Sequence, residues 1–364
     1  MAEFHLTRRC ALAAGISVLS GPACASPQKV RLGQIAARHA LTFGAAIEPQ
    51  FVKEDQDFAK LIAEQCRVLT AENALKWNAL RPSPDQFDFA AADRVAAIAQ
   101  ANGVPIHGHC LVWHEAMPDW LIRALSPATA ADLMTTHIDQ VVRRYAGRIV
   151  SWDVVNEVIE RNDRRLDGLR QSPWLRALGP DYIDLAFHAA HAADPQARLS
   201  LADYGLEYDN IGWMVEKRGT LLERLRALVG RGVPIHALAL QGHLLGDHAP
   251  AFGQGLADFL AAVADLGLDI YVTELDVNDQ NLAGSGTRRD SVVADIYARF
   301  LDVVLAQPAV KMVVTWGLSD RYTSKTNFFP RADGAPVRPL PFDQDLKPKA
   351  AAKAIAQAFD RRGG

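Results

Sequence analysis

Strand-like apolar segments and helix-like amphipathic segments alternate along almost the whole chain. Eight segments are predicted as strands because each is a short, nearly continuous apolar run; they are Thr42–Ile47, Cys66–Glu72, Pro105–Trp113, Ile149–Glu157, Ala197–Tyr204, Ile235–Leu244, Leu268–Asp276 and Lys311–Asp320. Helical periodicity lies between these runs and after the last one, at Asp55–Gln65, Ala90–Asn102, Ala128–Tyr145, Asp181–Ala193, Thr220–Arg231, Gly253–Leu266, Arg288–Ala306 and Lys349–Asp360. This alternation is typical of a parallel sheet covered by helices. Eight such units in 364 residues predict a single-domain α/β protein with the (β/α)8 fold, a TIM barrel.

Two observations favour this closed barrel over other architectures. A doubly wound open sheet would leave edge strands, and none of the eight predicted strands has the polar pattern of an edge. No stretch rich in Pro, Gly or Ser divides the chain, so residues 26–364 are predicted to form one barrel domain.

The net charge is only −3 and no block of Lys or Arg is present, so neither a nucleic acid nor an anionic membrane surface is expected as a partner.

The first 25 residues have the pattern of an export signal rather than of a folded element. Arg8 and Arg9 precede a short apolar run, and Ala23 and Ala25 form an A-x-A arrangement. The run is too short to span a bilayer. Residues 1–25 are therefore predicted to be a signal peptide of the twin-arginine type, which places the mature protein in the periplasm or outside the cell. The alternative is a disordered tail.

Two of the four cysteines lie in this leader. Cys24 would also suit a lipoprotein site, but Gly21 stands where such sites usually have Leu. Cys66 and Cys110 remain in the mature chain, and in an exported protein such a pair usually suggests a disulfide. Because Cys66 begins the second predicted strand and Cys110 lies near the end of the third, the two thiols are expected to be far apart, free and buried.

Six of the eight predicted strands end in polar or aromatic groups. These groups are Glu72 with Asn73, His107 with His109, Asn156 with Glu157, Gln241 with His243, Glu274 with Asp276, and Trp316. A single glutamate at a strand end is more often a helix cap or an ion-pair partner than a catalyst. In a (β/α)8 barrel, however, all the C-terminal strand ends meet on the face that carries active sites. The shared position therefore predicts a functional site on this rim.

Two carboxylates of the rim have a spacing that suggests a reaction. Glu157 ends the fourth predicted strand and Glu274 lies in the seventh, so the two can face each other across the barrel mouth. One protonated and one ionised carboxyl group are the usual machinery of glycosidic bond cleavage. Aromatic residues near the rim offer apolar faces for sugar rings, namely Trp113, Trp316, Tyr204, Trp77 and Trp120.

At these residues the chain resembles glycoside hydrolase family 10, the endo-β-1,4-xylanases, over nearly the whole mature sequence. The matching motifs occur in order, each at a predicted strand end. They are TAENALKW (Thr70–Trp77), GHCLVWH (Gly108–His114), WDVVNE (Trp152–Glu157), QGHL (Gln241–Leu244), VTELD (Val272–Asp276) and WGLSD (Trp316–Asp320).

The resemblance implies hydrolysis of internal β-1,4 bonds of xylan with retention of anomeric configuration. Glu157 would be the general acid/base and Glu274 the nucleophile. Asn156 would bind the sugar 2-OH, His243 supported by Asp276 would bond the nucleophile, and Gln241 would donate near Glu157.

The same resemblance implies a set of sugar-binding residues and a simple set of partners. The substrate-binding residues would be Glu72, Asn73, Lys76, His109, Trp113, Tyr204, Gln241 and Trp316. Xylan and xylooligosaccharides are the expected partners, with no metal or other cofactor, and we expect a monomer.

Three positions depart from the usual motifs of the family. Ala202 stands where an Asn is common, and Cys110 replaces a usual Thr. Ser324 falls where many members have an aromatic lid, so one side of the cleft is expected to be open. Phe328 and Phe329 follow in the same loop and either fill the gap in part or pack beneath the loop.

Three other functions are alternatives for the same barrel. A metal-dependent hydrolase would use the pair His107 and His109 with His243 and Asp320, although such pairs usually lie on the first strand of a barrel. A carbohydrate-binding barrel without activity would be expected to lack one of the two glutamates, and both are present. A β-1,4-glucanase or an enzyme of mixed specificity would use the same catalytic groups.

Overall fold

The computed structural model describes Met1 and residues 30–249 and 251–362; apart from Met1, the export signal predicted over residues 1–25 lies outside the described residues. The strands are β1 (Thr42–Ile47), β2 (Val68–Ala71), β3 (Ile106–Val112), β4 (Ile149–Asn156), β5 (Arg198–Asp203), β6 (Ala237–Leu240), β7 (His243–Leu245), β8 (Asp269–Asn278) and β9 (Val310–Thr315). All neighbours are parallel, and pairing of β6 with β8 and of β1 with β9 closes the sheet. The predicted single-domain (β/α)8 barrel is confirmed.

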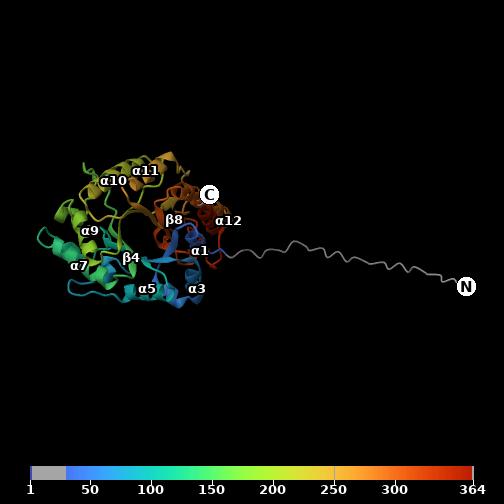
Figure 1. The fold of residues 1–364 in the computed structure, drawn as a ribbon, viewed down its shortest axis with the longest axis horizontal. Coiled ribbons are helices and arrows are strands. Elements are labelled where there is room, and N and C mark those ends of the chain that lie inside the picture. The colour runs from blue at the N-terminus through green and yellow to red at the C-terminus, as the bar shows by residue number, and fades with distance from the viewer. Residues whose placement is uncertain (2–29, 250, 363–364) are drawn as a thin grey trace.

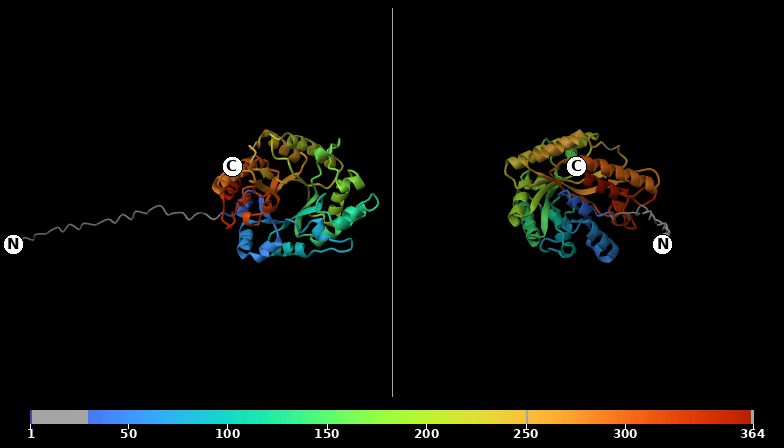
Figure 2. Two further views of the ribbon diagram at one scale, coloured as in Figure 1. Left: turned by 180° about the vertical axis from the view of Figure 1, so that it is seen from behind. Right: turned by 45° about the vertical axis from the view of Figure 1, so that its right-hand side comes forward.

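Helices cover the barrel on the outside. They are α1 (Leu32–Ala37), α2 (Pro49–Glu54), α3 (Gln56–Gln65), α4 (Trp77–Leu80), α5 (Ala90–Ala101), α6 (Asp119–Ala124), α7 (Ala130–Arg144), α8 (Pro173–Leu178), α9 (Tyr182–Ala193), α10 (Gly212–Gly230), α11 (Gln254–Ala264), α12 (Gly286–Val304), α13 (Lys325–Phe328) and α14 (Ala350–Arg361). Figure 1 shows the longer helices as a ring around the strands, and Figure 2 shows this ring from behind and at an angle. Within the described ranges, no helix combines the length and the apolar character needed to cross a membrane.

The last helix completes the ring between the first and the last barrel units. Helix α14 lies against α1 and α12. Its Phe359 ring packs 5.7 Å from the Phe43 ring of β1. At its start, the buried Lys349 Nζ lies 2.8 Å from Asp320 Oδ2 in the loop after β9. This ion pair fixes the loop that borders the barrel mouth. Asp320, which the alternative metal-dependent function would use as a ligand, is thus paired with Lys349.

A helix lies at each of the eight predicted helix positions, but one is much longer than predicted. Helix α10 begins at Gly212 rather than near Thr220. Its first half is rich in charged residues and therefore lacks a clear apolar stripe. In the structure two of these charged side chains, Lys217 and Arg218, are buried, and Lys217 Nζ lies 2.7 Å from the buried Asp203 Oδ1. Internal ion pairing thus replaces the apolar contact that sequence periodicity detects.

The sixth predicted strand, Ile235–Leu244, is wrong as a single element. The chain forms β6 and leaves the sheet at Gln241 and Gly242. It then forms the short β7, which pairs with the C-terminal end of β8. Gly242 has φ +78°, and a Cβ there would lie 3.1 Å from Val272 Cγ1. Glycine permits this bend because it has no Cβ. The bend brings Gln241 and His243 to the barrel mouth.

The expectation for the cysteines is confirmed. Cys66 and Cys110 are both free and both buried. Burial raises the pKa of the Cys66 thiol to about 12, even though Arg67 opposes this shift. No disulfide therefore joins Cys66 and Cys110, and packing of helices on the barrel holds the fold together.

Candidate active site

A cleft of about 440 Å³ opens at the C-terminal ends of the barrel strands. The predicted site residues that line it are Glu72, Asn73, Lys76, His109, Trp113, Asn156, Glu157, Gln241, His243, Glu274 and Trp316. Asp276 is fully buried next to His243, with Oδ1 3.0 Å from the imidazole Nδ1. The barrel thus brings together the two predicted catalytic glutamates and nearly all of their predicted partners.

Glu157 is held at the end of β4 in an unusual backbone conformation. Its φ is +58°, which is the left-handed region that costs a residue with a Cβ roughly 1–2 kcal/mol. Its N–H donates to the carbonyl of Ala202 at 2.8 Å, and its own carbonyl accepts from Arg170 Nε at 2.8 Å. Gln241 Nε2 donates to the carboxylate Oε1 at 2.9 Å. These bonds fix the direction in which the carboxyl group points.

A neutral histidine lies on the other side of Glu157. The Nδ1 of His114 is 3.9 Å from Glu157 Oε2. Burial, together with the positive charge of Arg170, lowers the pKa of His114 to about 4. The imidazole is therefore uncharged near neutral pH. The carboxylate of Glu157 therefore has an amide and a neutral imidazole next to it, and the nearby cation, Arg170, donates to the backbone carbonyl of Glu157.

Glu274 has the opposite surroundings. It lies within β8 and is only 5% exposed. Its Oε2 is 3.1 Å from His243 Nε2, and its Oε1 is 3.8 Å from His109 Nδ1. Burial by itself would raise the pKa of this carboxyl group, but the positive charge of His109 and the hydrogen bond from His243 outweigh burial, so the pKa is lowered. Glu274 is therefore ionised in the empty cleft.

His243 is a cation because of the carboxylate next to it. Burial favours the neutral imidazole, but Asp276 raises the pKa of His243 to about 9. The pKa of Asp276 is in turn lowered, since the charges of His243 and Lys325 outweigh its burial. Both imidazole nitrogens then carry protons, so that Nε2–H donates to Glu274 while Nδ1–H faces Asp276.

A polar wall lies at the ends of β1 and β2. Asn73 Nδ2 donates to Glu48 Oε1 at 2.5 Å, and Lys76 Nζ donates to Asn73 Oδ1 at 2.9 Å. Burial and the negative charge of Glu48 raise the pKa of Glu72 to about 7, against the hydrogen bond from Ser324. Glu72 is therefore a carboxyl group that can donate as well as accept hydrogen bonds near neutral pH.

Two indole rings border this polar wall. The ammonium of Lys76 lies 5.2 Å from the ring centre of Trp113 and 5.7 Å from that of Trp316. The ring of His109 lies 5.4 Å from that of Trp316. Polar groups next to flat apolar surfaces form the kind of site that suits a sugar, which has hydroxyls at its edge and C–H groups on its faces.

The two histidines of β3 do not form a metal site. His107 Nε2 and His109 Nδ1 both lie 3.0 Å from Asp153 Oδ2, and His107 Nδ1 is 2.8 Å from the hydroxyl of Ser151. His107 is fully buried below the cleft. Among the described residues, no group of three or more His, Cys, Asp or Glu side chains is arranged to hold a metal ion. The pair instead orients His109 toward Glu274.

Three of the predicted aromatic residues are not among the residues that line the cleft. The Tyr204 hydroxyl donates to Glu160 Oε2 at 3.0 Å and accepts from Arg170 Nη2 at 3.0 Å, behind Glu157. Trp77 is only 2% exposed and stacks on a buried histidine, and Trp120 donates to a backbone carbonyl. The expectation that Trp77 offers a face to sugar is wrong, because its position just after the second strand turns it inward.

The loop after β9 forms the remaining side of the cleft. Ser324, Phe328 and Phe329 all line it. Phe328 is 75% exposed and Phe329 is 39% exposed, so these rings do not simply pack beneath the loop. Ser324 itself contributes only a small side chain to this side of the cleft.

Four residues of the site did not appear among the predicted ones. Glu48 follows the first strand and could have been found by the strand-end rule. His114 belongs to the same motif as Trp113, which gave a weak signal. Arg170 lies in an irregular loop and Lys325 begins the short helix α13, and neither segment has a periodicity that indicates which way a side chain points.

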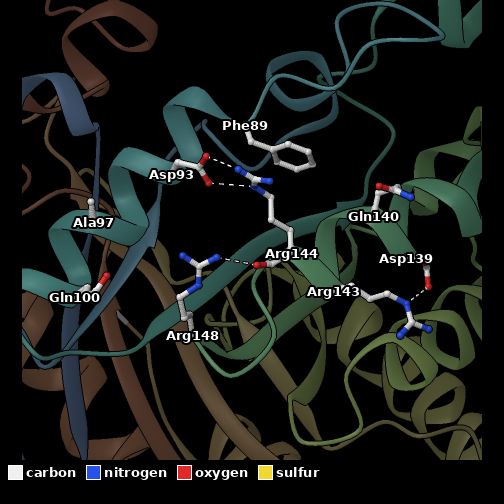
Figure 3. Close-up of a pocket in the computed structure, with 9 residues that line it drawn as sticks. All are labelled: Phe89, Asp93, Ala97, Gln100, Asp139, Gln140, Arg143, Arg144 and Arg148. Atoms are coloured by element: carbon white, nitrogen blue, oxygen red, sulfur yellow. Dashed lines mark hydrogen bonds and ion pairs between the residues drawn. The ribbon is translucent and has the colours of Figure 1, made fainter.

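Another hollow of about 650 Å³ lies on the outer surface between α5 and α7. Figure 3 shows that its guanidinium groups are already engaged: Arg144 binds Asp93, Arg143 binds Asp139 and Arg148 donates to the backbone carbonyl of Arg144. The hollow contains no pair of catalytic groups comparable to that of the cleft.

Comparison with known proteins shows which family the chain is similar to. The description "Glycosyl hydrolase family 10" belongs to the family profile that matches residues 31–358. Endo-1,4-beta-xylanase B of Paenibacillus barcinonensis is 34% identical over 333 residues, which cover 86% of this chain and 95% of that protein. Exoglucanase XynX of Acetivibrio thermocellus is 33% identical over 328 residues, which cover 86% of this chain but only 28% of that protein.

Solved structures have the same fold over nearly the same length. Xylanase 10B of Thermotoga petrophila RKU-1, solved in complex with xylobiose, superimposes with a TM-score of 0.82 at 30% sequence identity. The match covers 93% of this chain and 99% of that one. The family profile and the fold agree, and the chain belongs to glycosyl hydrolase family 10.

Proposed function

We propose that the protein hydrolyses internal β-1,4-xylosidic bonds of xylan, with Glu274 as the nucleophile and Glu157 as the general acid/base. One observation supports this assignment above all: the two carboxyl groups share a cleft but have different electrostatic surroundings. Glu274 lies between two cationic histidines, whereas the carboxylate of Glu157 faces the amide of Gln241 and the neutral His114. The cation next to Glu157, Arg170, donates to its backbone carbonyl. As a member of this family with xylanase relatives, the protein is an endo-1,4-β-xylanase.

The reaction takes place in two displacements at the anomeric carbon. In the first, an oxygen of Glu274 bonds to that carbon while Glu157 gives its proton to the departing glycosidic oxygen. In the second, water attacks the same carbon, Glu157 takes a proton from the water, and the bond to Glu274 breaks. This retaining course requires carboxyl groups about 5–5.5 Å apart. His243 and His109 stabilise Glu274 as an anion before attack and after release.

The remaining cleft residues bind the sugars. Asn156 lies beside Glu157 and is placed to bond the 2-OH of the reacting sugar. Glu72, Asn73 and Lys76 bind hydroxyls of the sugar units on the nucleophile side, and Trp113 and Trp316 provide faces for the rings. His109 and Gln241 orient the carboxylates as well as the substrate. None of these steps needs a cofactor.

A β-1,4-glucanase activity on the same groups is the second candidate. The similarity of this chain to a relative named as an exoglucanase supports this second candidate. Product profiling on xylan, carboxymethyl cellulose and mannan tests the proposal. We expect xylooligosaccharides from internal cleavage of xylan and little release from the other two polymers. Faster cleavage of carboxymethyl cellulose than of xylan would reject the xylan assignment.

Export and assembly are part of the proposal. We infer that residues 1–25 are a twin-arginine signal peptide and that the mature chain, residues 26–364, acts as a monomer in the periplasm or outside the cell. Arg8, Arg9 and the A-x-A arrangement ending at Ala25 support export. N-terminal sequencing of the secreted protein tests the cleavage position, and light scattering tests the monomer.

Ser324 is expected to leave room for side groups on the xylan chain. Ser324→Trp should therefore lose roughly tenfold more activity on glucuronoxylan than on linear xylooligosaccharides, because a bulky ring would occupy the open space above the cleft. Initial rates on both substrates measure this ratio. Ser324→Ala is the matched control, since it removes the hydroxyl without adding bulk, and its ratio should stay near that of the parent. Equal losses on both substrates in Ser324→Trp would show that Ser324 does not control access.

A further inference from the structure

The first residue of α13 is a buried lysine that the two displacements described above do not use. Lys325 is only 7% exposed. Its Nζ lies 2.9 Å from Asp276 Oδ2 and 3.4 Å from His243 Nδ1. A buried ammonium is costly unless it is paired, so this position indicates a specific electrostatic role.

The four charged groups form a row of alternating sign that ends at the nucleophile. Glu274 Oε2 is 3.1 Å from His243 Nε2, His243 Nδ1 is 3.0 Å from Asp276 Oδ1, and Asp276 Oδ2 is 2.9 Å from Lys325 Nζ. The positive charge of His243 and the negative charge of Asp276 sum to zero. Lys325 adds one further positive charge, so the three groups behind Glu274 are cationic as a unit.

We propose that Lys325 is a positioning residue which, through Asp276 and His243, promotes release of Glu274 from the covalent glycosyl-enzyme. This inference rests on the proposed role of Glu274 as the nucleophile. In the second displacement, the water oxygen bonds to the anomeric carbon while Glu157 takes a proton from that water. The bond between the sugar and Glu274 breaks, and its electron pair returns to the carboxylate.

The sign of the effect differs between the two displacements. During release, Glu274 gains negative charge, which a cationic unit behind it stabilises. During attack, Glu274 loses negative charge, so the same cation gives no help. At an effective dielectric constant of about 20, a unit charge some 8 Å away alters a rate by roughly fivefold when half a charge develops. Lys325 should therefore accelerate release without accelerating attack.

Lys325→Met tests this separation. With 2,4-dinitrophenyl xylobioside, attack is fast and release limits turnover. We expect kcat to fall roughly fivefold and KM to fall by a larger factor, while kcat/KM, which reports attack, does not fall and rises by up to roughly fivefold, because loss of the cation favours the loss of negative charge from Glu274 during attack. Stopped-flow measurement should show a larger burst of dinitrophenolate than in the parent, because the covalent intermediate accumulates.

Three further variants make the test specific. Lys325→Arg keeps the charge and should restore kcat. Lys347→Met removes an exposed lysine and should resemble the parent. If Lys325→Met is too unstable to assay, Lys325→Gln removes the charge while keeping a hydrogen-bond donor toward Asp276, and it should show the same split.

Other outcomes would overturn the inference. A fall in kcat/KM as large as that in kcat, with an unchanged burst, would mean that Lys325 acts by packing or by touching the sugar. Failure of Lys325→Arg to restore kcat would exclude a role for its charge. A parent enzyme that forms no covalent intermediate at all would instead reject the nucleophile assignment, so the two failures are distinguishable.

Discussion

Glu274→Ala is expected to lose activity on every substrate, by roughly 10⁴-fold or more. No other carboxylate in the cleft is held between two cationic histidines, and the alanine side chain cannot attack an anomeric carbon. The loss should therefore be the same for xylan and for aryl xylobiosides with good leaving groups. Initial rates on both kinds of substrate measure it.

A matched control separates lost chemistry from lost folding. Glu216→Ala removes an exposed glutamate that pairs with Arg161 on the outside of the barrel, and it should leave activity unchanged. Melting temperatures of both variants should be recorded, since removal of Glu274 leaves His109 and His243 without their shared anion. Substantial activity of a folded Glu274→Ala variant on activated aryl xylobiosides would contradict its role as the nucleophile.

Glu157→Ala should show a strong dependence on the leaving group. Acid assistance contributes roughly 10²–10⁴-fold when the leaving oxygen is basic, as in xylan, and little when it is dinitrophenolate. We therefore expect kcat/KM for 2,4-dinitrophenyl xylobioside to stay close to that of the parent, while kcat/KM on xylooligosaccharides falls by two to four orders of magnitude. Release still needs a base, so kcat on the aryl substrate should fall and KM should fall with it.

This pattern distinguishes the two glutamates. Glu274→Ala should remove kcat/KM on the activated substrate, whereas Glu157→Ala should preserve it. If both variants lost kcat/KM equally on the dinitrophenyl substrate, the assignment of roles would be wrong. Glu157→Gln provides a second test, because it keeps the size of the side chain and removes only the proton transfer.

Most strands, and the shared position of Glu157 and Glu274 at the barrel mouth, could be predicted from sequence because their signals are local. The run Thr42–Ile47 coincides with β1, since a strand buried on both faces has to be apolar along its whole length. Polar residues at strand ends stand out against such runs. The regular order of the barrel then placed Glu157 and Glu274 on one rim.

Other features could not be predicted because they depend on contacts between distant segments. The first half of α10 is helical through internal ion pairs such as that of Lys217 with Asp203, which no periodicity indicates. The break between β6 and β7 depends on the positive φ of Gly242. Arg170 reaches the carbonyl of Glu157 from a loop, and Lys325 reaches Asp276 from the start of the short helix α13. These contacts join segments that are far apart in the sequence, so they become visible only in the folded structure.

The separate surroundings of the two glutamates explain why their roles cannot be exchanged. Glu274 is stabilised as an anion by His243 and His109, so it is poor at holding a proton. The carboxylate of Glu157 instead lies next to the amide of Gln241 and the neutral imidazole of His114, while Arg170 donates to its backbone carbonyl. The protein therefore achieves two functions with one residue type by changing what lies around each carboxyl group.

The most direct test of this account is to trap the covalent intermediate. The enzyme is incubated with 2,4-dinitrophenyl 2-deoxy-2-fluoro-xylobioside, digested and analysed by mass spectrometry of its peptides. The account predicts one added fluoroxylobiosyl group, attached to Glu274. Attachment to another side chain, or an unlabelled enzyme that releases products of inverted configuration, would contradict it.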